Sequence, residues 1–336
     1  MADVGMAALD PGLQAAPLVS VDDLRVHFQR GAGRPPLRAV DGVSFTLQVG
    51  ETFAVIGESG SGKSTLARAL VQLQPITGGR VTLSGRDPTQ LGAEALRMLR
   101  RDFQIVFQDP RASLNPRMRI RSLISEPLEI QRIGDARERA QAVLELLDRV
   151  ELGPEFADRY PHQLSGGQRQ RVNIARALAV RPKVLVCDEV VAALDVSIQA
   201  GILNLFKDLQ ERFGLTYVFI THDLAATAYL ASRIAVMYLG VFVELGDKDE
   251  VTQRPLHPYT QALLATTPEP LPSWRARRAV PLQGEIPSPV APPSGCRFRT
   301  RCPLAAARCA QEVPAWRELR PGHFVACHFA TAGVAA

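Results

Sequence analysis

The chain has 336 residues, of which 46% are hydrophobic and 22% are charged. This composition is typical of a folded globular protein and excludes a disordered or collagen-like chain. No uncharged apolar run reaches the roughly 18 residues that a membrane span needs, and Asp3 and Asp10 interrupt any secretory-signal pattern at the N-terminus. We therefore expect residues 1–17 to be a disordered lead-in and the protein to stay in the cytoplasm.

Charge and cysteine are unevenly distributed along the chain. The formal net charge is +5, and residues 271–301 alone hold six arginines against one glutamate. The remainder is close to neutral, so we expect no nucleic-acid-binding surface. Four of the five cysteines fall in the last 41 residues. In a reducing compartment such a group indicates a metal rather than disulfides.

Apolar runs alternate with helical stretches between about residues 18 and 250, and this pattern predicts an α/β sheet that carries a helical subdomain at about 109–180. Strands are expected at 19–28, 44–49, 52–56, 103–107, 184–187 and 217–220, and helices at 63–73, 119–128, 135–150 and 166–180. Ten prolines occur between residues 255 and 293. Since proline disfavours core elements, we expect a first domain at 18–252 and an extension at 253–336.

The segment 57–65, GESGSGKST, matches the phosphate-binding pattern G-x-x-x-x-G-K-[ST] between an expected strand and an expected helix. Glycines let the loop curl so that its N–H groups point at phosphates, and the helix adds its positive end. Lys63 can reach the β- and γ-phosphates, and Ser64 can ligate Mg²⁺. The predicted nucleotide-binding residues of this loop are Gly57, Glu58, Ser59, Gly60, Ser61, Gly62, Lys63, Ser64 and Thr65.

Two further motifs indicate what kind of phosphate loop this is. Asp188 and Glu189 end an apolar strand, where Asp188 can hold Mg²⁺ and Glu189 can polarise water for attack on the γ-phosphate. Residues 164–168, LSGGQ, begin a helix 20 residues before Asp188 and form a second anion site. A sandwich dimer explains why one chain carries two phosphate-binding helix ends.

The order of these motifs, with Gln108 after a strand, Ala193-Leu194-Asp195 and Thr221-His222-Asp223, resembles the nucleotide-binding subunit of ABC transporters over about residues 18–250. The resemblance implies a RecA-like P-loop NTPase core with an antiparallel β subdomain and a helical signature subdomain. It implies that Gln108 takes part in Mg²⁺ and water sensing and that His222 contacts the γ-phosphate. Phe28 matches the aromatic that stacks on adenine, and a core role for Phe28 stays open.

The same resemblance implies head-to-tail dimers. In such dimers Ser165, Gly166 and Gly167 of one subunit cover the γ-phosphate held by the other. Gln168 and Asp195 are further predicted nucleotide-binding residues. One departure concerns residues 190–192, Val-Val-Ala, where the family usually has Pro-Thr-Ser. We expect hydrolysis to be retained, because the two carboxylates, Asp195 and His222 are present.

Five segments resemble the ATPases of oligopeptide, dipeptide and nickel importers, and most closely the second of their two paired ATPases. They are residues 107–117, 160–171, 257–260, 284–289 and 293–298. This implies ATP-driven peptide import at the cytoplasmic face of the inner membrane. The implied partners are a second ABC ATPase, two permease subunits and an extracytoplasmic solute-binding protein. A soluble ABC ATPase of translation or DNA repair and a low-activity structural half are the alternatives. The solute itself stays open.

The C-terminal cysteines, Cys296, Cys302, Cys309 and Cys327, are spaced C-x5-C-x6-C-x17-C. The short spacings that zinc sites favour are absent, whereas four thiolates are compatible with an iron–sulfur cluster. The family resemblance implies a [4Fe–4S] cluster; zinc and reduced buried thiols are the alternatives. Nearby arginines would neutralise such a cluster, or form a solvated face or a lipid-headgroup contact: Arg297, Arg299 and Arg301.

Overall fold

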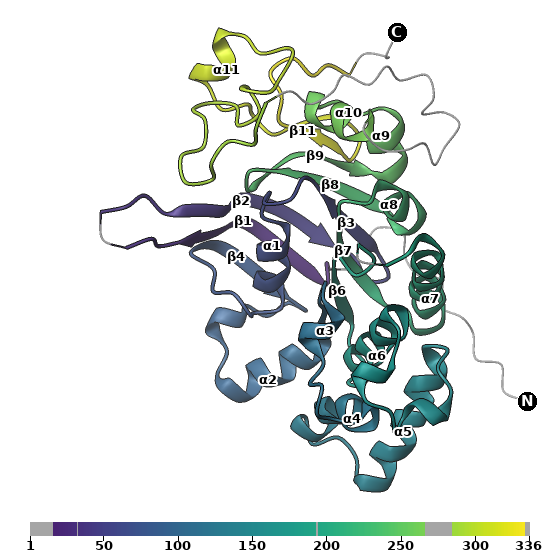
Figure 1. The fold of residues 1–336 in the computed structure, drawn as a ribbon. Coiled ribbons are helices and arrows are strands. Elements are labelled where there is room, and N and C mark those ends of the chain that lie inside the picture. The colour runs from purple at the N-terminus through teal and green to yellow at the C-terminus, as the bar shows by residue number, and fades with distance from the viewer. Residues whose placement is uncertain (1–15, 32, 193, 266–283, 333–336) are drawn as a thin grey trace, which may run out of the picture.

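The computed structural model describes residues 16–31, 33–192, 194–265 and 284–332. Its main sheet has the strand order β10-β11-β9-β8-β3-β7-β6-β5 (Figure 1). The strands β5, β6, β7, β3 and β8 run parallel, whereas β9 and β11 are antiparallel to their neighbours. Their bounds are β3 (Thr52–Ile56), β5 (Phe103–Val106), β6 (Val184–Asp188), β7 (Thr216–Thr221), β8 (Arg233–Tyr238), β9 (Val241–Asp247), β10 (Arg317–Arg320) and β11 (His323–Val325).

The centre of this sheet is buried on both faces. Every residue of β3, β6 and β7 is buried, as expected for parallel strands covered by other layers. The expected strands at 184–187 and 217–220 are confirmed, and each is slightly longer in the structure. Because β3, β7 and β6 are parallel neighbours, the loops that follow them meet at one edge of the sheet.

A second, antiparallel sheet has the order β2-β1-β4, formed by β1 (Val19–Phe28), β2 (Leu37–Leu47) and β4 (Gly78–Leu83). Helix α1 (Lys63–Leu70) packs against strands of both sheets. The expected strand 44–49 was wrong at both ends, because pairing with β1 begins at Leu37 and ends at Leu47. The expected helix 63–73 is shorter and ends at Leu70.

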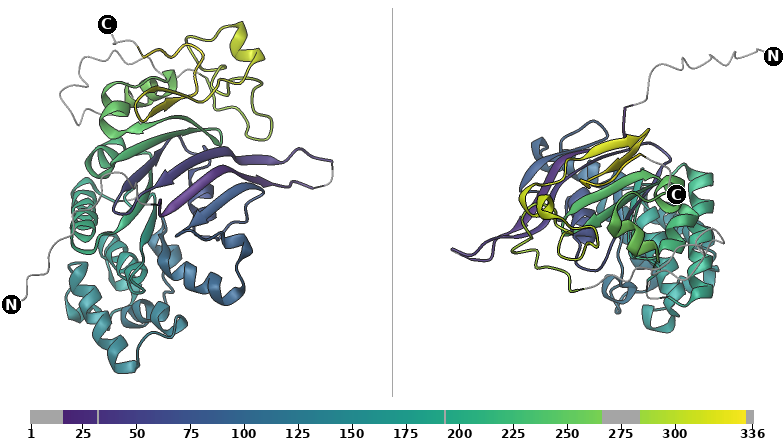
Figure 2. Two further views of the ribbon diagram at one scale, coloured as in Figure 1. Left: turned by 180° about the vertical axis from the view of Figure 1, so that it is seen from behind. Right: turned by 90° about the horizontal axis from the view of Figure 1, so that it is seen from above.

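Helices α4, α5 and α6 pack together at one end of the main sheet. In Figure 1, and from behind in Figure 2, α4 and α5 lie at the end of the molecule opposite the C-terminal region. Helices α4, α5 and α6 confirm the expected helical segments, with bounds that differ by a few residues. Besides α1, the α-helices outside the C-terminal region are α2 (Ala93–Asp102), α3 (Pro110–Ser113), α4 (Ile120–Ile130), α5 (Ala136–Arg149), α6 (Gly166–Leu178), α7 (Val196–Phe213) and α8 (Leu224–Leu230).

The C-terminal region continues the main sheet. Strand β11 pairs with β9, and the buried carboxylate of Glu244 on β9 accepts hydrogen bonds from Leu256 N, His257 N and His323 Nε2 at 2.8, 2.9 and 2.7 Å. The expected extension therefore shares a sheet with the rest of the chain through β10 and β11, two strands that the sequence did not predict. The C-terminal region begins at residue 248, and its helices are α9 (Lys248–Gln253), α10 (Pro258–Ala265) and α11 (Ala307–Gln311).

Some expectations concern residues outside the described ranges. They include most of the expected lead-in 1–17, Ala193 of the Ala-Leu-Asp motif, and the proline-rich stretch at 266–283. No helix among the described residues is both long enough and apolar enough to cross a membrane.

Candidate nucleotide site

The phosphate loop joins β3 to α1, as predicted. Lys63 Nζ donates to the carbonyl oxygens of Gly57 at 2.7 Å and Glu58 at 2.9 Å, which holds the ammonium group inside the loop. Burial lowers the pKa of Lys63, while the carboxylates of Glu189, Asp188 and Glu58 oppose that change. Two carbonyl oxygens therefore accept from the Lys63 ammonium group inside the loop.

Two glycines of the loop have no room for a side chain. Gly57 (φ +153°) and Gly62 (φ +108°) would place a Cβ 2.2 Å from Met237 O and 2.0 Å from Ala39 O respectively. Gly60 also has a positive φ, +79°, but open space around it. Gly57 and Gly62 are therefore required because the loop packs closely against neighbouring backbone. Gly60 is favoured only because its φ is positive.

A hydroxyl and a carboxylate meet beside the loop. Ser64 Oγ, on the first turn of α1, donates a 2.8 Å hydrogen bond to Asp188 Oδ1 at the end of β6. Burial raises the pKa of Asp188, and the hydrogen bond from Ser64 and the charge of Arg68 oppose the rise. Hydroxyl and carboxylate oxygens are the ligands that Mg²⁺ prefers, so this pair fits the predicted magnesium site.

Glu189 lies between two of the predicted partners. Gln108 Nε2 donates to Glu189 Oε2 at 2.8 Å, and His222 Nδ1 lies 3.5 Å from Glu189 Oε1. The Glu189 side chain is 13% exposed and that of His222 is 52% exposed. The ends of β5, β6 and β7 supply the three residues, so the parallel sheet brings them together at the edge that carries the phosphate loop.

The other predicted residues lie apart from this group. Ser165 and Gln168 form a capping box at the start of α6, in which Ser165 Oγ accepts from Gln168 N and Gln168 Oε1 accepts from Ser165 N. Asp195 is exposed at the start of α7, and Phe28 is 37% exposed at the end of β1. In the described part of the chain, no hydrogen bond or ion pair joins Ser165, Gln168 or Asp195 to the phosphate loop.

The cysteine group gives no support to a bound metal. Cys296 N donates to Cys309 O at 2.8 Å, so two segments of the motif are paired through their backbone. Burial raises the pKa of the Cys296 thiol to about 11, with smaller contributions from the three other thiols. Among the described residues, no three His, Cys, Asp or Glu side chains converge closely enough to bind a metal ion. The predicted iron–sulfur cluster is therefore not supported by this geometry.

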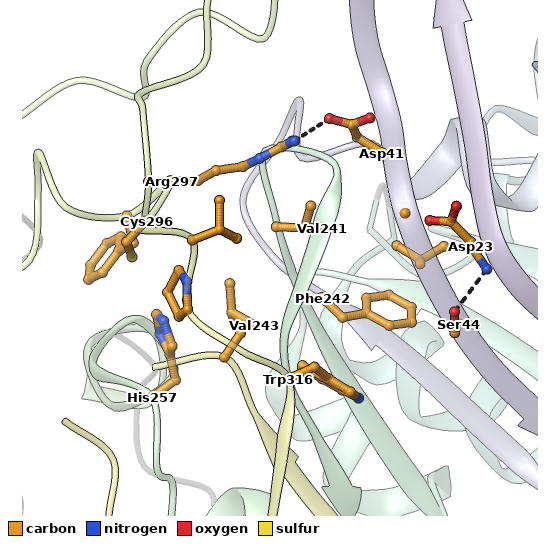
Figure 3. Close-up of a pocket in the computed structure, with 17 residues that line it drawn as sticks. Asp23, Asp41, Ser44, Val241, Phe242, Val243, His257, Cys296, Arg297 and Trp316 are labelled. Carbon is orange, nitrogen blue, oxygen red and sulfur yellow. Dashed lines mark hydrogen bonds and ion pairs between the residues drawn. The ribbon is translucent and has the colours of Figure 1, made fainter. Parts of the chain in front are cut away.

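Arg297 lies at a contact between the C-terminal region and β2 and not on a solvated face. Arg297 pairs with Asp41 of β2 and donates to Leu239 O, next to a cavity of about 370 Å³ that Val241, Phe242 and Trp316 also line (Figure 3). Burial alone would raise the pKa of Asp41, but Arg297 and His27 lower it below its usual value. The expectation of a solvated or lipid-facing Arg297 was wrong, because this side chain joins the C-terminal region to β2.

Arg301 makes a contact that the sequence did not indicate. Its Nη1 and Nη2 lie 2.6 and 3.0 Å from Glu58 Oε2 and Oε1, and its side chain is 5% exposed. Tyr259 Oη, on α10, accepts a 2.9 Å hydrogen bond from Glu58 N. Since 243 residues separate Arg301 from Glu58, no local pattern points to their pairing. The predicted solvated role of Arg301 was also wrong.

Comparison with known proteins agrees with this geometry. Residues 40–192 match the ABC transporter family, and residues 243–309 match the family described as oligopeptide/dipeptide transporter, C-terminal region. A probable peptide ABC transporter ATP-binding protein of Sinorhizobium fredii is 51% identical over 324 residues, 95% of this chain and 92% of that protein. The Bacillus subtilis oligopeptide transport ATP-binding protein AppF is 51% identical over 303 residues, 90% of this chain and 92% of that one.

A solved structure shares the fold of the cassette. The ATP-binding cassette MJ0796, in a dimeric post-hydrolysis state bound to ADP and Pi, has a TM-score of 0.62 and 32% identity. The match covers 68% of this chain and 98% of that cassette. The chain therefore belongs to the ABC transporter family of ATPases and carries the C-terminal region found in oligopeptide and dipeptide transporters.

Proposed function

We propose that this protein hydrolyses ATP to energise the import of peptides through separate membrane permease subunits. The observation that carries the proposal is the convergence of Lys63, Asp188, Glu189, Gln108 and His222 at one sheet edge of a chain that also has the oligopeptide/dipeptide C-terminal region. Relatives with about half of their residues identical are named as peptide and oligopeptide transport ATP-binding proteins. Their names suggest the peptide substrate.

In this proposal each residue has a distinct task. The loop N–H groups and Lys63 bind the β- and γ-phosphates, and Ser64, Asp188 and Gln108 hold Mg²⁺. When bound, Mg²⁺ neutralises charge on the phosphate oxygens. Glu189 accepts a proton from the attacking water, and Gln108 orients the Glu189 carboxylate through the 2.8 Å hydrogen bond. His222, 3.5 Å from Glu189, contacts the γ-phosphate from the other side.

A second ABC ATPase completes the site. Ser165 and Gly166 are exposed at the α6 N-terminus, and its free N–H groups are available to the γ-phosphate bound by another subunit. Asp195 lies exposed at the start of α7, where a partner can contact it. We propose a heterodimer on the cytoplasmic face of the inner membrane, attached to two permease subunits and served by an extracytoplasmic solute-binding protein.

The segment after Glu189 bears on whether hydrolysis is retained. Val190 and Val191, which replace the family's usual Pro-Thr, are 2% and 0% exposed and belong to the core formed with the helical layer. Burial anchors this segment, and the presence of both carboxylates, Asp195 and His222 supports an active site over the low-activity alternative. Steady-state ATPase activity of the assembled complex, with the second ATPase inactivated, separates the two.

A transport assay tests the proposal. A host strain that lacks the gene should lose uptake of labelled di- and oligopeptides, and the wild-type gene should restore it. A gene with Glu189→Gln should not restore uptake. A gene with Glu145→Gln, which changes an exposed side chain on α5, should restore it. If the gene restored uptake of nickel but not of peptides, nickel and not peptide would be the solute. Co-purification with ribosomes or DNA, and no permease, would support the soluble ABC ATPase.

We also propose that Cys296, Cys302, Cys309 and Cys327 hold a [4Fe–4S] cluster in the protein as it is made in cells. The support is that Cys296 and Cys302 pack against the same buried cluster and that Cys296 N donates to Cys309 O at 2.8 Å, so three of the four cysteines lie in one part of the C-terminal region. Each ligand of a four-iron cluster binds a different iron, so such a site does not need side chains that converge on one ion.

The metal content tests this assignment directly. Protein purified without oxygen should contain about four irons per chain and absorb near 400 nm. Cys302→Ser should lose both signals, while Cys187→Ala, which changes the fifth cysteine inside β6, should keep them. One zinc per chain, or no metal, would refute the cluster and leave the ATPase assignment intact.

A further inference from the structure

The C-terminal region holds one residue of the phosphate loop from two directions. Arg301 binds the Glu58 carboxylate through both of its terminal nitrogens, at 2.6 and 3.0 Å, and Tyr259 Oη accepts from Glu58 N at 2.9 Å. The same residue's carbonyl oxygen accepts from Lys63 Nζ at 2.9 Å. Glu58 therefore links the C-terminal region to the lysine that binds phosphate.

The arginine is held in place by buried rings. Its guanidinium carbon lies 5.9 Å from the centroid of the Tyr238 ring on β8. Tyr238, Tyr259 and Phe298 contact one another with ring centroids 4.8 to 5.4 Å apart, and all three are fully buried. A planar guanidinium in such a setting presents a rigid two-pronged contact, which a lysine does not reproduce.

The charge of Glu58 makes this contact relevant to ATP. An unpaired carboxylate in the second position of the loop would repel the polyphosphate, and the Glu58 charge already acts on Lys63 by raising its pKa. Pairing with Arg301 neutralises that charge and ties the side chain away from the loop interior. Two hydrogen bonds, from Glu58 N to Tyr259 Oη and from Lys63 Nζ to Glu58 O, hold the loop backbone in position at this residue.

We propose that Arg301 is a positioning residue for ATP binding: through Glu58, the segment that carries Cys302 controls the affinity of the phosphate loop for nucleotide. The proposal rests on ATP binding by this loop and adds a site of control outside the cassette. A change in the Cys296–Cys302 segment that moves Arg301 would then alter ATP affinity without touching a catalytic group.

Nucleotide titration of the full-length chain tests the proposal, with a fluorescent ATP analogue displaced by ATP. Arg301→Gln should raise the Kd for ATP on the order of fivefold or more, as is typical of coupled sites. The double variant Glu58→Gln/Arg301→Gln should bind ATP more tightly than Arg301→Gln alone, because no unpaired carboxylate is left. Arg301→Lys, which keeps the charge and loses the two-pronged contact, should lie between them.

Arg320→Gln is the matched control. Arg320 belongs to the same region, is largely buried and pairs with Glu250 at 2.9 Å, on α9 and not on the loop. It should leave the Kd unchanged even where thermal unfolding without nucleotide shows an equal loss of stability. Equal Kd values for Arg301→Gln and Arg320→Gln, or a double variant no better than Arg301→Gln, would overturn the inference. A wild-type chain that binds no ATP would instead refute the proposed function.

Discussion

Ser64 and Asp188 lie 124 residues apart in the chain and are joined by a 2.8 Å hydrogen bond from Oγ to Oδ1. The bond links the first turn of α1 to the end of β6, so the two oxygens that would bind Mg²⁺ are already side by side. Burial raises the pKa of the Asp188 carboxyl, which means that the fold disfavours its charged form. The site therefore has a cost to stability that a bound cation relieves.

Asp188→Asn should stabilise the nucleotide-free protein and abolish its activity. At neutral pH the charged carboxylate, with its raised pKa, destabilises the fold, and an amide removes that charge while it can still accept from Ser64. We expect the Tm without Mg²⁺ and ATP to rise by roughly 2–4 °C. Differential scanning calorimetry measures this. A lower Tm would show that the attraction of Asp188 to Lys63 outweighs burial.

Glu189→Gln should keep ATP binding and reduce steady-state hydrolysis by about 100-fold or more, since general-base catalysis contributes that much. The amide retains the contact with Gln108 but cannot accept the proton from water. Phosphate release and nucleotide titration on the same preparation measure the two effects. A wild-type rate in the assembled transporter, with the second ATPase also mutated, would contradict the role of Glu189.

Two glycine substitutions in the loop should differ in cost. Gly62→Ala places a methyl group 2.0 Å from Ala39 O and should destabilise the fold by about 3 kcal/mol or more, as severe clashes do. Gly60→Ala meets open space and carries only the cost of a positive φ, about 1 kcal/mol. Urea unfolding measures both free energies. Equal losses would show that backbone conformation, not close packing, dominates at Gly62.

His257 should make stability depend on pH. Burial lowers its pKa from 6.5 to about 3, so the folded protein keeps this side chain neutral while the unfolded chain protonates it below pH 6.5. Its contribution is fully present above pH 6.5 and is lost as pH falls towards 3, by up to about 1.4 kcal/mol per pH unit.

The matched variant is His257→Gln, which can still accept from Tyr259 N. Between pH 7.5 and 4.5, its unfolding free energy should fall less steeply than that of the wild-type protein. Parallel slopes for the two proteins in urea titrations would contradict the role given to His257.

Regular elements with a strong local pattern were predictable. The buried strands β3, β6 and β7 are short apolar runs, and α5 begins with Asp135 and Glu138, whose side chains form a capping box. Strand β10, Arg317–Arg320, was missed because its residues are mostly charged and show no apolar alternation. Its partner β11 is a strand because the edge of β9 offers unpaired backbone groups, which no local pattern records.

By itself, the sequence determined the nucleotide site as a set of motifs, because each motif acts through nearby backbone: glycines that curl a loop, a lysine within it, and carboxylates at the end of a strand. Tertiary structure decided which residues of these motifs contact one another. The parallel order β3-β7-β6-β5 brings Gln108 and His222 to Glu189. Docking of the C-terminal region on β8 and β9 brings Arg301 to Glu58 across 243 residues. Such contacts depend on how buried surfaces pack, and spacing along the chain carries no information about them.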